Sequence, residues 1–150
     1  MIHPKPLRLS SARPSTEAAS PLTWVSLTAA IGFLLGLVYI HLWLVPMHLE
    51  EKPYIGLLFV VASVLMVAVC LGLLSARVRT LAWWGGAAVC LGMAAGYVCS
   101  RTVGLPAGYH ESWDDPWGTA CLVLEGLYLL AMAIWLRGAG ARRTATENGL

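Results

Sequence analysis

The chain is poor in charge. Asp, Glu, Lys and Arg make up 12% of its 150 residues, whereas a soluble domain carries about 25%. Hydrophobic residues account for 58%, and the mean hydropathy is +0.70. A soluble domain of this length could not bury so much apolar side chain, because much of its surface faces water. The composition therefore excludes an ordinary soluble domain, a disordered chain and a secreted disulfide scaffold.

Strong basic charge and cysteine pairs are missing as well. The formal net charge is +2, and no basic patch is interleaved with aromatic residues, so we expect no nucleic-acid partner. The four cysteines include no C-x-x-C pair. Neither a zinc site of that kind nor a thioredoxin-like motif is therefore indicated.

Long apolar runs make up most of the sequence. They cover residues 22–45, 54–74, 81–99 and 117–136, and a helix of about 20 residues crosses a hydrocarbon layer of roughly 30 Å. The runs lack the alternation of barrel strands. We predict an all-α fold: an up-down bundle of four transmembrane helices over 22–136, with an outer loop at 100–116, embedded in the lipid bilayer of the plasma membrane.

The basic residues predict the orientation. The segments before the first helix, between the second and third, and after the fourth hold most of them, and only Lys52 and Arg101 fall in the other two connections. The predicted cytoplasmic set is Lys5, Arg8, Arg13, Arg77, Arg79, Arg137, Arg142 and Arg143. By the positive-inside rule both termini are cytoplasmic. Residues 1–21, rich in Ser, Pro and Ala, are expected to form a disordered cytoplasmic tail, and 137–150 a second, polar one.

Glu125 is the most informative single residue, because it falls inside the fourth apolar run. Helical rise places it roughly 12 Å below the outer end. A carboxylate at that depth costs a few kcal/mol unless it is neutral, paired or hydrated. Two interpretations stay open: a proton-carrying or ligand-binding group, or a polar clamp bonded to a neighbouring helix or subunit.

Two basic side chains are candidate partners for this acid. His41 falls about 6 Å inside the outer end of the first helix, and Arg101 lies at the outer end of the third. Arg101 could pair with Glu125 or with acidic residues of the outer loop, which would offset the cost of burying charge. We predict a polar cluster of Glu125, His41 and Arg101, in which Glu125 faces inward and contacts at least one of the two bases, directly or through water.

A metal site is an alternative use of the histidines. His41, His48, Glu50 and Glu51 come close together in the sequence. His with Met suits copper, and His with carboxylate suits zinc or iron. The spacing is not that of a tight site, and Pro46 biases Val45 away from helical geometry, so His48 is expected in the connection. An interfacial histidine near a solvated acidic loop is the favoured interpretation; no cofactor is predicted, with haem or a transition metal as the alternative.

The outer loop combines acids, a histidine and aromatics. Its candidate functional residues are His110, Glu111, Asp114 and Asp115, which could dock a partner, bind a cation or lie at the headgroups. Asp115-Pro116 also suits the start of a helix. Cys99 and Cys121 both fall near the outer side, where an oxidising compartment permits a disulfide.

Small residues recur at helical spacing in two of the predicted helices. Gly32 and Gly36 form a G-x-x-x-G in the first, and Ala88, Gly92 and Gly96 form a longer stripe in the third. Such stripes let helices approach closely in lipid. We therefore expect both stripes to pack against neighbouring helices of the bundle, with a dimer face as the less common alternative.

One stretch carries a family resemblance. Arg101-Thr102-Val103-Gly104-Leu105-Pro106, followed by an acidic, Trp-containing loop and a helix bearing Glu125, resembles small four-helix membrane proteins of high-GC actinobacteria. The resemblance covers the second to fourth helices. It implies a four-helix membrane fold and no particular activity.

Three functions follow as hypotheses. The leading one is a non-enzymatic accessory or scaffold subunit that binds another membrane protein or a second copy of itself, because no catalytic motif is present beside a conspicuous polar centre. The second is a metal- or haem-binding redox protein using His41, His48 and Glu125. The third is a small transporter that couples to protons or cations through Glu125.

Overall fold

The computed structural model describes residues 21–147, with side chains described as far as residue 140. It contains four long helices, α1 (Pro21–Glu51), α2 (Pro53–Leu74), α3 (Arg79–Arg101) and α4 (Pro116–Glu147), and a short 3-10 turn, η1 (Pro106–Gly108), between α3 and α4. Each of the four is long and apolar enough to cross a membrane. The described residues form no strand beyond one isolated bridge. The predicted all-α, four-helix fold is confirmed, and it fits a multi-pass membrane protein.

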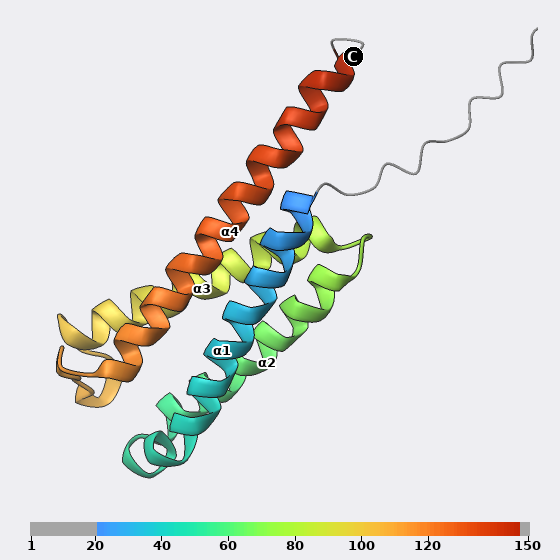
Figure 1. Cartoon of the computed structure of the whole chain (residues 1–150). Helices are drawn as coiled ribbons and strands as arrows, with labels where there is room; N and C mark the ends of the chain where they lie inside the picture. The colour runs from blue at the N-terminus through green and yellow to red at the C-terminus, as the bar shows by residue number, and fades with distance from the viewer. Residues whose placement is uncertain (1–20, 148–150) are drawn as a thin grey trace, which may run out of the picture.

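The helices form a ring in which each one packs on two others. α1 packs on α2 and α4, and α3 packs on the same two helices. Within the described part of the chain, the diagonal pairs do not pack on each other. The start of α1 and the far end of α4 lie at the same end of the bundle (Figure 1). We call the end that carries the α3–α4 connection the loop end, and the end with the α2–α3 turn the turn end.

α1 is longer than the sequence predicts. We expected it to end at Val45 before Pro46, but it continues to Glu51 with Pro46 inside it. A proline removes one backbone hydrogen bond, whereas ending the helix there would leave a whole turn of carbonyl groups unpaired in an apolar layer. The expectation that His48 lies in the connection is therefore wrong: His48 is on α1, on the same face as His41.

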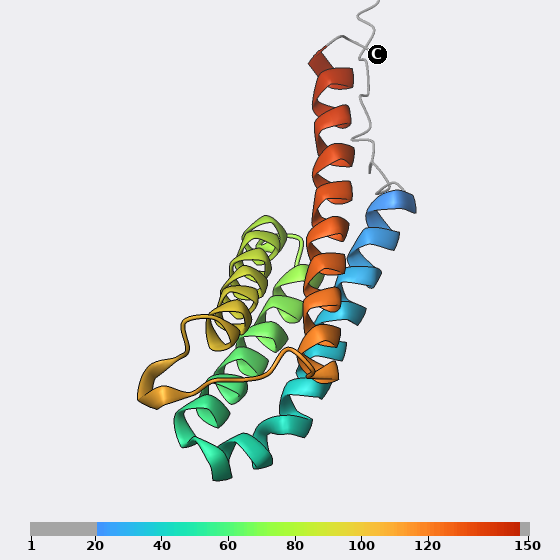
Figure 2. The ribbon, with the colours of Figure 1, turned by 90° about the vertical axis from the view of Figure 1, so that its left-hand side faces the viewer.

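α4 also extends past its predicted end. The expected span stops at Leu136, yet the helix continues to Glu147 and projects beyond the other three helices (Figure 2). The sequence after Leu136 contains no proline and several Ala and Arg residues, which are good helix formers. Part of the predicted polar tail at 137–150 is thus helical. The predicted N-terminal tail falls on residues 1–20, outside the described residues, and Pro21 already belongs to α1.

Tight packing is concentrated toward the turn end. Trp83 of α3 and Tyr128 of α4 are fully buried, and the Tyr128 hydroxyl donates to the Trp83 carbonyl oxygen at 3.1 Å. The Trp83 ring also stacks on Trp135, with the ring centroids 5.4 Å apart. Gly86 makes this contact between α3 and α4 feasible, because a Cβ there would collide with the Tyr128 hydroxyl.

The predicted small-residue stripes have different roles. Gly36 of α1 packs closely, since a Cβ at this position would lie 3.3 Å from Leu124 of α4. Gly32, Gly92 and Gly96 would meet no atom within 4 Å. The expectation that the α3 stripe packs against a neighbouring helix is therefore wrong. Gly92 and Gly96 line a cavity instead.

Because Gly86 is crowded and Gly85 is not, alanine substitutions at these two glycines should differ in their effect on the free energy of unfolding. Gly86→Ala should lower the free energy of unfolding by about 1–3 kcal/mol, because the new methyl group displaces Tyr128. Gly85→Ala is the matched control, because its Cβ would make an ordinary 3.9 Å contact with Val69. Thermal unfolding in detergent measures both. Equal melting temperatures for the two variants would contradict this packing.

Candidate functional site

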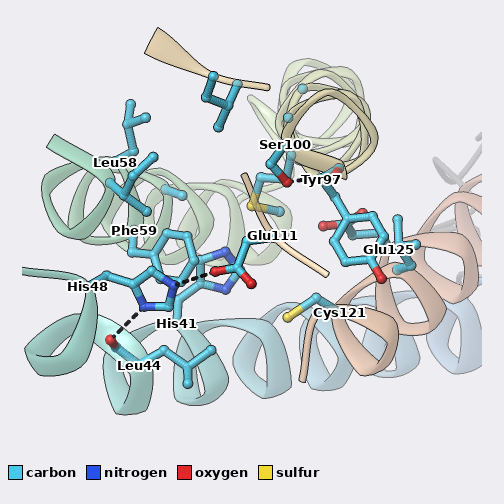
Figure 3. A pocket seen from close by; sticks show the side chains of 18 of the residues that line it. His41, Leu44, His48, Leu58, Phe59, Tyr97, Ser100, Glu111, Cys121 and Glu125 are labelled. Atoms are coloured by element: carbon cyan, nitrogen blue, oxygen red, sulfur yellow. Dashed lines mark hydrogen bonds and ion pairs between the residues drawn. The ribbon is translucent and has the colours of Figure 1, made fainter. Parts of the chain in front are cut away.

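The loop-end half of the bundle encloses a cavity of about 530 Å³. All four helices and the α3–α4 loop line it, mostly with apolar side chains (Figure 3). Its polar lining residues are His41, His48, Tyr97, Ser100, Arg101, Tyr109, Glu111, Asp115, Cys121 and Glu125. The cavity therefore collects most of the candidate functional residues that the sequence indicates.

The cavity opens through the side of the bundle. Among its lining residues, those exposed at the surface are Leu58, Val61 and Leu65 of α2 and Ala88 and Gly92 of α3. Leu58 is 55% exposed and Leu65 47%. α2 and α3 diverge from their shared turn (Figure 1), which separates them at this height. Helical rise places these α2 residues roughly 8–18 Å from the loop end, within the depth of a hydrocarbon layer.

The α3–α4 loop closes the loop end of the cavity. It runs across the end of α2 (Figure 2), where Lys52 donates to the Ala107 carbonyl oxygen at 3.2 Å and Tyr54 to that of Pro106 at 2.5 Å. Gly104 turns the chain with φ +81°, and a Cβ there would collide with the His110 ring. Tyr109, a residue of this loop, is buried.

Arg101 is held by the loop and not by Glu125. Its Nη2 atom donates to Asp115 Oδ2 at 2.8 Å, and its Nη1 atom to Ser100 Oγ at 2.8 Å. The guanidinium carbon lies 3.6 Å from the centre of the Tyr97 ring, and the side chain is 4% exposed. The sequence offered Glu125 and the loop acids as partners; the structure selects a loop acid.

Asp115 has a second role at the start of α4. Its two carboxylate oxygens accept the backbone N–H groups of Trp117 and Gly118 at 2.9 and 3.0 Å, so the predicted helix start at Asp115-Pro116 is confirmed. A carboxylate at a helix N-terminus is stabilised by the helix dipole. One side chain therefore joins the loop, α3 and α4.

Glu125 is buried without a polar partner. It is 4% exposed, lines the cavity, and its Oε2 atom has no hydrogen-bond partner. Among the described residues, neither His41 nor Arg101 bonds to it directly. All three residues line the same cavity, so the structure brings the predicted cluster into one space while leaving the carboxyl unpaired.

The two histidines flank one aromatic ring. His41 and His48 lie one above the other on α1, and their ring centroids are 4.7 and 4.6 Å from that of Phe59 on α2. Each Nδ1 atom donates to a backbone carbonyl four residues earlier, that of Leu37 or Leu44, at 2.9 Å. This bond leaves the Nε2 atom of each ring for other partners.

Glu111 reaches from the loop toward His48. Its Oε1 atom lies 4.0 Å from His48 Nε2 and accepts a hydrogen bond from the Tyr109 hydroxyl. Burial, followed by the bond to Glu111, raises the pKa of the Tyr109 phenol well above its ordinary value, so this group stays a neutral donor. In Figure 3, Glu111 and the histidines lie on one side of the view, with Cys121 and Glu125 on the other.

The remaining predicted site residues lie apart from the cavity. Glu50, Glu51, His110 and Asp114 are exposed, so the proposed metal set of His41, His48, Glu50 and Glu51 is not assembled. No three His, Cys, Asp or Glu side chains within the described part of the chain are placed to hold a metal ion. Cys99 and Cys121 are free thiols and not a disulfide.

Sequence reasoning missed the aromatic part of the site. Tyr97 lies four residues before Arg101, on the same face of α3, and this spacing could have identified it as a stacking partner. Phe59 and Tyr109 had no such signal. Their roles depend on how α1 meets α2 and on the path of the loop.

Comparison of the chain with protein-family models, curated proteins and solved structures gave no match. The geometry of the cavity is therefore the basis for proposing a function.

The Arg101–Asp115 pair predicts a specific loss of stability. Asp115→Asn keeps a side chain that caps a helix but leaves the buried guanidinium without its charge partner. We expect a decrease of about 2 kcal/mol in the free energy of unfolding, the typical value for a hydrogen bond to a charged group. Asp114→Asn, at an exposed neighbouring acid, is the matched control and should unfold like the wild type. Thermal unfolding in detergent, followed by circular dichroism, compares the two.

Proposed function

We propose that this membrane protein binds a small amphiphilic molecule, which it takes up from the bilayer through the opening between α2 and α3. The observation that carries the proposal is the buried Glu125 carboxyl, unpaired within a mostly apolar cavity. The lining would hold the apolar part of the ligand, and Glu125 would accept a hydrogen bond from its polar part.

The position of the opening supports a lipid-soluble ligand. Lining residues such as Leu58 and Leu65 are exposed on the side of the bundle, where a membrane protein meets hydrocarbon. The loop end is covered, because Tyr109 is buried and the loop is bonded to Lys52 and Tyr54. A molecule dissolved in the bilayer therefore has the shorter route into the cavity.

The state of Glu125 supports a polar group on that ligand. A buried acceptor without a donor costs about 1–3 kcal/mol relative to a bonded one. Proteins retain such a destabilising buried group where their function requires it. Ligand pockets have this general composition, with mostly apolar walls and a few polar groups that orient the molecule.

The distribution of basic residues supports an orientation with the loop end outward. In that orientation the cavity lies in the outer half of the bilayer, and both termini are cytoplasmic. The ligand would then come from the outer leaflet.

Glycine substitutions test the cavity directly. Gly92 lines the cavity and has open space at its Cβ position, whereas Gly32 has equal space but lies outside the cavity. Gly92→Leu should fill the cavity and exclude the ligand, and Gly32→Leu should not. Each protein is purified from cell membranes in mild detergent, and its lipid-soluble molecules are extracted and quantified by mass spectrometry. We expect one compound to be retained by the wild type and by Gly32→Leu and lost from Gly92→Leu. The same bulk phospholipids in all three would refute the proposal.

A second test uses the opposite effects that the Glu125 carboxyl should have on folding stability and on ligand binding. Glu125→Leu removes a buried unpaired carboxyl and should raise the free energy of unfolding by about 1–3 kcal/mol, while it abolishes retention of the compound. Glu125→Gln keeps a polar group in the same place and should give little or none of this gain. Thermal unfolding of ligand-free protein measures the difference. A clear destabilisation by Glu125→Leu would indicate that the carboxyl is structural.

The other hypotheses stay predictions from the sequence. A scaffold role would appear as a partner protein that co-purifies in mild detergent. A redox role would appear as visible absorbance or a stoichiometric metal. Transport through Glu125 shares the need for an accessible cavity with the binding proposal, and it requires in addition a route to the other side of the membrane.

A further inference from the structure

We infer that the ligand is a cationic amphiphile, with a protonated amine bound at Glu125 and an alkyl or similar apolar part in the cavity. This inference rests on the proposed function and specifies its ligand class. It follows from a comparison of the charged side chains of the cavity that already have a partner with the one, Glu125, that has none.

The arginine of the cavity already has an acid partner at its Nη2 atom, and only its Nε atom is left without a hydrogen-bond partner. Arg101 is the one Lys or Arg among the described residues that line it, and its guanidinium is paired with Asp115 at 2.8 Å and lies over the Tyr97 ring. An anionic headgroup would have to compete with Asp115 for this cation. Such a group would also meet the carboxyl group of Glu111, and like charges repel strongly where water is scarce.

The two remaining acids differ in what they already contact. Glu111 accepts the Tyr109 hydroxyl and lies near His48, so its interactions are used in holding the loop. Glu125 has neither a base nor a donor on its Oε2 atom. It is the carboxyl that gains most from an incoming donor, and a cation beside it favours its ionised form.

An amine fits this position better than a neutral donor does. A hydrogen bond between an ammonium and a carboxylate is about twice as strong as one between neutral groups, and it strengthens further in a site of low dielectric. Glu125 lies roughly 13 Å along α4 from the helix start. An alkyl chain attached to the amine can therefore stay among the apolar lining or extend between α2 and α3 into lipid.

The experiment compares three probes of equal chain length: dodecylamine, dodecanol and dodecanoate. The full-length protein is placed in phosphatidylcholine nanodiscs, and affinities are obtained from the rise in melting temperature with probe concentration. We expect dodecylamine to bind at least about tenfold more tightly than dodecanol, and dodecanoate more weakly than either. Glu125→Gln should remove the preference for the amine, and Glu50→Gln, at an exposed acid of α1, should retain it.

An infrared difference spectrum of the wild type keeps the test valid if Glu125→Gln does not fold. Addition of dodecylamine should increase the absorbance of an ionised carboxylate, and addition of dodecanol should not. This readout responds to the charge pair itself and not to general stabilisation by an apolar chain.

The possible outcomes distinguish failure of the cationic ligand class from failure of the proposed binding function. Equal affinity for amine and alcohol, with both weakened by Gly92→Leu, would overturn the cationic inference and leave the binding proposal standing. Loss of the preference in Glu111→Gln but not in Glu125→Gln would overturn it too, since the cation would then bind beneath the loop. If no probe changes the melting temperature of any variant, the proposed function itself fails.

Discussion

The structure depends first on the shortage of water around its backbone. In a hydrocarbon layer each N–H and C=O group must find a partner within the protein, and helices satisfy this requirement locally. This constraint carries α1 through Pro46 to Glu51. That continuation places His48 on the same helix face as His41, with both rings beside Phe59. A shorter helix would have left the cavity without His48 in its lining.

The bundle is packed unevenly along its length. Toward the turn end, α3 packs tightly against α4 through Trp83, Tyr128 and Gly86, where even an added Cβ would collide. Toward the loop end, Gly92 and Gly96 contribute no side chains, and the helices enclose a cavity of about 530 Å³. Dense packing stabilises the first region. It also allows the second region to hold space and a buried carboxyl without loss of the fold.

Sequence reasoning identified the cavity's charged residues but not their pairing. Glu125 and Arg101 both stand out as ionisable groups at membrane depth or at its edge, and both line the cavity. A direct bond between them, one of the contacts that the sequence allowed for Glu125, does not form, because Asp115 caps α4 and is carried by the loop to within 2.8 Å of Arg101. Asp115 therefore pairs with the arginine, and Glu125 is left unpaired.

The sequence by itself determined the number of helices, their apolar character and the burial of Glu125, because each follows from the cost of exposing polar groups to hydrocarbon. Local patterns also determined the start of α4 at Asp115-Pro116. Only the tertiary structure decided which acid pairs with Arg101, how Phe59 meets the histidines, and that Gly92 faces space and not a helix. These features depend on the angle between α2 and α3 and on the path of the α3–α4 loop, which arise from packing between distant segments.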